Sequence, residues 1–164
     1  MKATDLLKQQ HRAVEALFAK IEAGEPSALS DLASALAAHM TIEHKLFYPA
    51  ALEVDEELVL ESFEEHSVAE YALKRALADD PEDDSFDARV TVLKELIEHH
   101  VKEEEGDLFP QVEKAMSKDE LEALGEKMEK RFDDALKRGY AALLPQTYEQ
   151  TAADLSREQE EAAE

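Results

Sequence analysis

Histidine and glutamate recur four residues apart along this chain, at a spacing that can direct two metal-binding side chains to one point. Four residues of an α-helix turn about 400°, so the second side chain lies roughly 40° from the first and one turn along. Imidazole and carboxylate groups that converge in this way are typical metal ligands. Five of the six histidines are followed by such a glutamate, far more than 27 glutamates in 164 residues would give by chance. The pairs expected on four separate helices are His11 and Glu15, His39 and Glu43, His66 and Glu70, and His100 and Glu104.

Two of these pairs belong to a longer repeated frame. Residues 39–49 read HMTIEHKLFYP and residues 100–110 read HVKEEEGDLFP. In both, the glutamate follows the histidine by four places and a proline follows the glutamate by six. The likeness has two explanations, an old duplication or a shared geometric need, and the sequence leaves both open.

The composition of the chain excludes several classes of protein and of binding site. The length of 164 residues predicts one domain with a sizeable core. Its 40 acidic and 18 basic residues give a net charge of -22, which argues against binding of nucleic acid or an anionic membrane. The lack of cysteine excludes disulfides, thiolate metal sites and iron–sulfur clusters. No apolar run approaches the length of a membrane span, and we expect a soluble, cytoplasmic protein.

Helix-forming residues dominate, and no stretch alternates with the period of a strand. We expect helices over about 5–22, 27–52, 55–78 and 86–112, with Thr4 and Asp55 as N-caps. Ser117 and Glu120 have the form of a capping box that opens a helix over 117–138. Short turns between long helices predict an all-α, up-down-up-down four-helix bundle with a short fifth helix and a C-terminal tail. The expected organisation is a bundle over 1–116, an amphipathic helix packed on it over 117–138, and a partly disordered or loosely helical tail over 139–164.

Helical phase selects the inward members of the pairs. At 100° per residue, three pairs lie within the apolar sector of their helices, and His11 lies inward near the edge of its own. A carboxylate on a core face is costly unless it is paired or binds a metal. The phase places His99 away from the core and His44 about a quarter-turn from Glu43. A solvated or supporting role is therefore expected for His44, His99, Glu15 and Glu103. The candidate metal ligands are His11, His39, Glu43, His66, Glu70, His100 and Glu104.

The donor set narrows the choice of metal. Four imidazoles and three carboxylates are too many for one tetrahedral zinc ion and too rich in nitrogen for magnesium or calcium. Seven donors suit two five- or six-coordinate first-row ions that share bridging carboxylates, and iron is the expected ion. Ferritin-like bundles use glutamate before histidine at a spacing of three, so the order and spacing here disfavour that family.

With these ligand positions, the chain resembles the hemerythrin-like HHE cation-binding domain family. The segments HRAVEALFAKIE and HHVKEEEGDLFP are similar to the first and fourth helices of that family, and the resemblance covers roughly residues 4–138. It implies two iron ions with an oxo or hydroxo bridge, Glu43 and Glu104 as bridging carboxylates, and the four histidines as terminal ligands. The oxygen carriers of the family have a histidine where this chain has Glu70, and an aspartate one place beyond Glu104. This difference argues against simple reversible oxygen carriage.

Three functions follow from these observations. The leading interpretation is a non-haem di-iron protein that binds or reacts with a small ligand, namely oxygen, nitric oxide or hydrogen peroxide, with turnover left open. The second is an iron- or oxygen-sensing, metal-binding interaction module with a protein partner bound through the fifth helix or the tail. The third is a metal-free structural bundle, in which loss of the buried charge of Glu43 would stabilise the fold.

Overall fold

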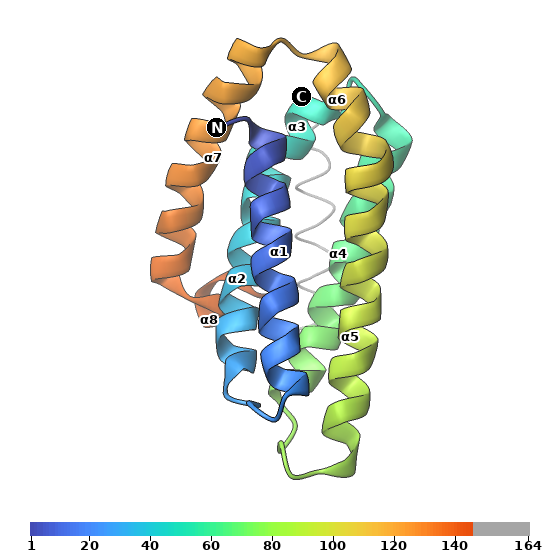
Figure 1. Cartoon of the computed structure of the whole chain (residues 1–164), viewed down its shortest axis with the longest axis vertical. Coiled ribbons are helices and arrows are strands. Elements are labelled where there is room, and N and C mark those ends of the chain that lie inside the picture. The colour runs from blue at the N-terminus through green and yellow to red at the C-terminus, as the bar shows by residue number, and fades with distance from the viewer. Residues whose placement is uncertain (146–164) are drawn as a thin grey trace.

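Four long helical segments run alternately down and up and pack side by side (Figure 1). The computed structural model describes residues 1–145, and within them it is all-helical, as the sequence predicted. Predictions for residues 146–164 lie outside the described part. The elements are α1 (Ala3–Glu22), α2 (Ala28–Ile42), η1 (Glu43–Phe47), α3 (Tyr48–Ala51), α4 (Glu56–Leu77), α5 (Asp84–Glu103), η2 (Glu104–Leu108), α6 (Phe109–Ala115), α7 (Lys118–Arg138) and α8 (Tyr140–Leu143).

Side-chain caps fix where two of these helices begin. Asp55 accepts a hydrogen bond from the backbone N–H of Leu58 at 3.1 Å, so it caps α4 as predicted. Ser117 and Glu120 form the expected capping box at the start of α7.

The predicted N-cap of the first helix is wrong. Helix α1 begins at Ala3 with Lys2 in the N-cap position, so Thr4 lies inside the helix and is fully buried. Its hydroxyl instead donates to Glu113 Oε1 at 2.7 Å. A threonine hydroxyl near a helix start was expected to satisfy a free backbone N–H, but a carboxylate on α6 provides a stronger, charge-assisted partner.

Two long helices that the sequence predicted as regular each contain a π-helical turn. These turns, η1 and η2, begin at Glu43 and Glu104. They close with hydrogen bonds from the N–H of Tyr48 to the carbonyl of Glu43, and from the N–H of Phe109 to that of Glu104. The next residue in each case is a proline, which has no N–H and whose ring presses on the carbonyl four residues earlier. A wider turn directly before it accommodates both effects, and the two repeated frames thus share one backbone form.

The apolar core consists of two clusters, one at each end of the bundle. One fills the end near the α1–α2 and α4–α5 loops and includes Phe18, Leu32, Leu73 and Leu93. The other lies toward α3 and α6 and includes Leu7, Phe47, Phe63 and Phe109. The buried histidines lie between residues of these two clusters along their helices, so a polar layer crosses the middle of the bundle. No helix in residues 1–145 is long and apolar enough to cross a membrane.

Helix α7 runs along the outside of the bundle against α1 and α2 (Figure 1). Its approach to the start of α1 is very close, because a Cβ atom added at Gly125 would lie 2.3 Å from the carbonyl oxygen of Met1. Only glycine fits at this point. After α7, the short helix α8 packs on α2, and Leu144 is buried in the adjoining core cluster.

Candidate metal centre

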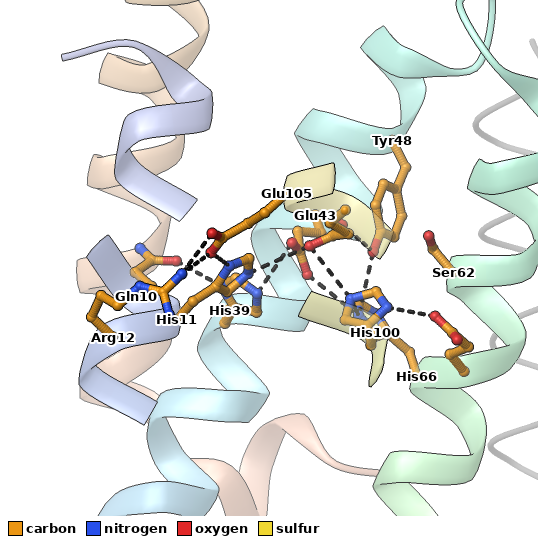
Figure 2. A network of polar contacts seen from close by, with 12 residues as sticks. Gln10, His11, Arg12, His39, Glu43, Tyr48, Ser62, His66, His100 and Glu105 are labelled. Atoms are coloured by element: carbon orange, nitrogen blue, oxygen red, sulfur yellow. Dashed lines mark hydrogen bonds and ion pairs between the residues drawn. The ribbon is translucent and has the colours of Figure 1, made fainter. Parts of the chain in front are cut away.

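Six of the seven predicted ligands come together in the middle of the bundle, where four helical segments face one another (Figure 2). Each is at most 4 % exposed. Their donor atoms form two groups, within each of which all atoms lie within 4.8 Å of one another. The first group contains His11, His39, Glu43 and Glu104, and the second contains Glu43, His66 and His100.

Glu43 joins the two groups. Its Oε1 lies 3.1 Å from His39 Nε2, one turn earlier on the same helical segment. Its Oε2 lies 3.4 Å from His66 Nε2 on α4. The two oxygens of one carboxylate therefore face histidines from different groups, as a bridging ligand would.

Glu104 has a similar position on the opposite segment. Its Oε2 lies 3.4 Å from His11 Nε2 and 3.5 Å from His100 Nε2. Its Oε1 accepts a hydrogen bond from the hydroxyl of Tyr48 at 3.0 Å. That hydroxyl also lies 3.3 Å from His66 Nε2, so Tyr48 reaches the centre itself.

All four histidines direct Nε2 inward and Nδ1 toward an outer partner. For Nε2 to be free as a ligand, Nδ1 must carry the proton and donate it, and outer partners of this kind fix both the tautomer and the orientation of metal-binding histidines. The outer contacts are His11 with Glu105 at 2.8 Å, His39 with Gln10 at 2.8 Å, His66 with His44 at 2.7 Å and His100 with Glu65 at 2.7 Å.

The centre fits a metal because several buried polar atoms lack any other partner. Both oxygens of Glu43, Oε2 of Glu104 and Nε2 of His11 are buried without a hydrogen-bond partner among the described residues. Leaving such atoms unsatisfied is costly. In addition, Nε2 of His66 and Nε2 of His100 lie only 2.9 Å apart. Two lone pairs at that separation repel unless a cation or a proton lies between them. Residues of this chemistry would hold one or more cations here.

Electrostatics divide the histidines into two kinds. Burial lowers the pKa of His39 and His66 well below the ordinary value, and positive charge on His11 and His100 respectively adds to this effect. Burial also opposes protonation of His11 and His100, but nearby carboxylates outweigh it. Glu104 is the main cause that raises the pKa of His11, and Glu104 and Glu65 raise the pKa of His100 to about 9.

The two oxygen ligands and the tyrosine respond to the same burial. Desolvation raises the pKa of Glu43, although the surrounding histidines partly oppose it. Desolvation and then the negative charge of Glu104 raise the pKa of Tyr48 well above its ordinary value. Without a metal, Tyr48 therefore keeps its proton and donates a hydrogen bond to Glu104.

The structure does not bring Glu70 into either group. It is buried, as its helical phase predicted. Burial lowers the pKa of Lys74, and the negative charge of Glu70 partly opposes that shift. Helix α4 runs in the opposite direction to α2 and α5 (Figure 1), and Glu70 follows His66 by about one turn along it.

The other residues for which a lesser role was expected lie outside both of these donor groups. Glu15 is exposed and pairs with Arg12, and His99 is 63 % exposed. His44, in contrast, is buried and supports His66. Of the two roles expected for His44, solvated or supporting, the structure shows the supporting one. Pro49 was the signal in the sequence that could have revealed the π turn that begins at Glu43.

Space for a small molecule adjoins the centre. An enclosed cavity of about 10 Å³ is lined by the four histidines together with Val14, Leu36, Met40, Ile97 and Val101. That volume accommodates roughly one water-sized molecule. A groove of about 620 Å³ lies between α1 and α5 and shares His11, Val14, Ile97 and Val101 with the cavity. Arg12 and Glu105 are paired at the side of this groove, with Nη2 of Arg12 2.6 Å from each oxygen of Glu105.

Comparisons with known proteins agree with this geometry. A family model for the hemerythrin HHE cation-binding domain matches residues 2–112. The structure is similar to a crystal structure of a hemerythrin HHE cation-binding domain-containing protein from Mycobacterium kansasii, with a TM-score of 0.76 and 26 % identity, over 96 % of this chain and 99 % of that one. Comparison with curated proteins gives no match. The chain therefore belongs to the hemerythrin HHE cation-binding domain family.

Proposed function

We propose that this chain is a non-haem di-iron protein that binds or reacts with a small ligand such as oxygen, nitric oxide or hydrogen peroxide. The observation that carries the proposal is the pair of donor groups joined by Glu43, with buried oxygens that have no other partner. Two such groups suit two ions with a shared carboxylate better than one. The proposed ligands are His11, His39, Glu43, His66, His100 and Glu104.

The residues around the centre are suited to this function. Bound iron would supply the electrons for reduction of the ligand. The outer partners hold each Nε2 toward the centre, and Tyr48 can donate a hydrogen bond there. The cavity beside the histidines is small and apolar on its outer side, so it favours a small uncharged molecule. The groove between α1 and α5 gives such a molecule a path to that wall.

Metal content and an absorption spectrum test the proposal. We expect purified protein to contain about two iron ions per chain, with near-ultraviolet bands that change on addition of azide, peroxide or nitric oxide. Chelation should remove the bands and lower the melting temperature, because metal binding contributes to folding. Iron-reconstituted protein without such bands, and without a reaction with these ligands, would contradict the proposal.

Two glutamate variants make the test specific. Glu43→Gln should lose iron and lower the stability of the protein as purified. A metal-free structural bundle makes the opposite prediction, since neutralising a buried carboxylate whose oxygens have no hydrogen-bond partner would stabilise it. Glu70→Gln is the matched control, because the same change is made at a buried glutamate that lies outside both donor groups. We expect it to retain its iron; loss of iron would restore Glu70 to the ligand set.

A sensing role is the second candidate, and one contact favours it. Helix α7 touches η1, the turn that begins at Glu43, so a change at the centre has a direct path to the outside of the bundle. Removal of residues 139–164 should then leave iron content and spectrum unchanged while a partner is no longer bound. Identical partner binding by the shortened chain would contradict a role for this segment.

A further inference from the structure

A second group of metal-binding side chains lies on the surface, between α4 and α5. It consists of Glu65, His99 and Glu103, whose donor atoms all lie within 4.8 Å of one another. His99 and Glu103 are four residues apart on α5 and therefore share a face, while Glu65 approaches from the neighbouring helix α4. None of the three is a ligand in the buried centre.

The distances in this group suit an ion better than they suit direct pairing. His99 Nε2 lies 3.4 Å from Glu65 Oε1 and 3.4 Å from Glu103 Oε1. An N–H···O hydrogen bond is normally 2.7–3.2 Å long, so the imidazole is beyond that range from both carboxylates. Ligand atoms about 2.0–2.1 Å from a tetrahedral ion are about 3.4 Å apart. The distance from the imidazole nitrogen to each carboxylate oxygen therefore equals the distance expected between two ligand atoms of one ion.

Glu65 provides an independent indication, because it connects this group to the buried centre. While Oε1 faces His99, Oε2 accepts the hydrogen bond from His100 Nδ1 at 2.7 Å. The carboxylate is therefore held in place by a buried partner. A rigidly held carboxylate beside an exposed imidazole is a preorganised site, which reduces the cost of ordering ligands when an ion binds.

We propose that Glu65, His99 and Glu103 form a second, solvent-facing site for a divalent first-row cation such as Zn²⁺ or Fe²⁺, with water completing the coordination. One imidazole and two carboxylates are a donor set that such ions accept. The net charge of -22 attracts cations to the surface. Its three ligands differ from the buried donors, so the proposal does not rest on iron as the metal of the buried centre.

The shared glutamate makes the two sites interdependent. A cation on Oε1 of Glu65 draws electron density from Oε2 and so weakens the hydrogen bond that His100 donates. The buried ligand is then less well supported when the outer site is filled. The coupling must be reciprocal, so a change in the charge of the buried centre alters the affinity of the outer site by the same factor.

Titration with Zn²⁺ tests the outer site. Purified protein of measured metal content is titrated by calorimetry, and the histidine resonances are followed by ¹⁵N NMR. We expect one Zn²⁺ per chain to bind with a shift of the His99 imidazole signal. His99→Ala should abolish this binding, and Glu103→Gln should weaken it by at least about tenfold. Glu98→Gln is the matched control, since it removes an exposed glutamate from the same helix that pairs with Lys94 and is not in the group, and it should bind Zn²⁺ like the unmodified protein.

The outcomes are separable from those of the di-iron proposal. All three variants leave the buried donors in place, so the content of buried metal should be unchanged. Equal Zn²⁺ affinity in His99→Ala and the unmodified protein would overturn the outer site, as would absence of Zn²⁺ uptake by the unmodified protein. Protein that contains no iron, but binds Zn²⁺ through His99, would overturn the proposed function alone.

Discussion

The two repeated frames, residues 39–49 and 100–110, have the same backbone and different chemistry. Each places a histidine, a glutamate at the start of a π turn, and a proline two residues after the end of that turn. In the first frame, His39 is supported by the amide of Gln10, and the residue after the glutamate, His44, supports His66. In the second, His100 is supported by Glu65, and the residue after the glutamate, Glu105, supports His11.

The comparison shows that one set of residues determines where the ligands lie and another set determines how strongly they donate. The repeated histidine, glutamate and proline fix where the ligands lie. The outer partners are an amide and an imidazole in one frame and two carboxylates in the other, and the pKa values of the supported histidines are lowered in the first case and raised in the second. Each donor group contains one histidine of each kind, so each ion would receive one strongly and one weakly supported imidazole.

The largest expected effect, on metal affinity, comes from giving the second frame an amide as outer partner in place of a carboxylate, as in the first frame. Glu105→Gln keeps a hydrogen-bond acceptor beside His11 Nδ1 but removes its charge, which makes His11 a weaker ligand. Metal affinity, measured by competition with a chelator, should fall about 10- to 100-fold. Glu15→Gln is the matched control, because it removes the other carboxylate partner of Arg12 and leaves His11 untouched. Similar affinities in both variants would show that the charge of the outer partner has no such role.

A smaller effect is expected from the aromatic residue before each proline, which is Tyr48 in one frame and Phe109 in the other. Tyr48→Phe makes the two frames alike and leaves Glu104 Oε1 without its donor. The free energy of unfolding of the iron-loaded protein should fall by about 1–2 kcal/mol, as measured with urea. Tyr71→Phe, at a half-exposed tyrosine on α4, should change it much less. Equal losses would mean that the Tyr48 hydroxyl is not selectively important.

The smallest effect concerns the helices after the prolines. Glu113 on α6 accepts from Thr4, whereas the corresponding residue of the first frame is the apolar Leu52. The Thr4 hydroxyl is the main cause of the lowered pKa of Glu113, with help from Lys8 and Lys2. A lowered pKa stabilises the fold above the unfolded-state value of about 4.3, and that stability is lost as the pH falls through the folded-state pKa.

Thr4→Val should therefore cost about 0.5–1 kcal/mol at neutral pH, and the cost should shrink toward about pH 4. Unfolding with urea at the two pH values measures it. Thr41→Val serves as the control, because that hydroxyl donates to the backbone carbonyl of Ala37 and involves no carboxylate. A cost that is the same at both pH values would contradict the role assigned to Glu113.

Helical periodicity predicted the fold and most of the candidate centre, and it failed at identifiable points. It distinguished buried His100 from exposed His99, because both lie before the π turn, where 100° per residue holds. It gave no indication that His44, about a quarter-turn from Glu43, is buried and supports His66. Glu70 is buried, as its helical phase predicted, but the structure places it outside both donor groups, and its role as a metal ligand stays a prediction.

The outer partners could not be predicted from spacing at all. Gln10 and Glu65 are single residues on other helices, and their contacts with His39 and His100 depend on how far each helix slides along its neighbour. Nothing in the local sequence encodes that offset.

The π turns also determine how an insertion or deletion would alter the residues around the centre. A π turn is an α-helix that contains one residue more than its neighbouring turns require. Deletion of a single residue between Glu43 and Pro49 would restore a regular helix and turn Tyr48 and the whole of α3 by about 100° about the axis. The two frames can therefore be regarded as helices with the same insertion, and length variation at these two points, rather than substitution, is the most direct way to change which side chains surround the centre.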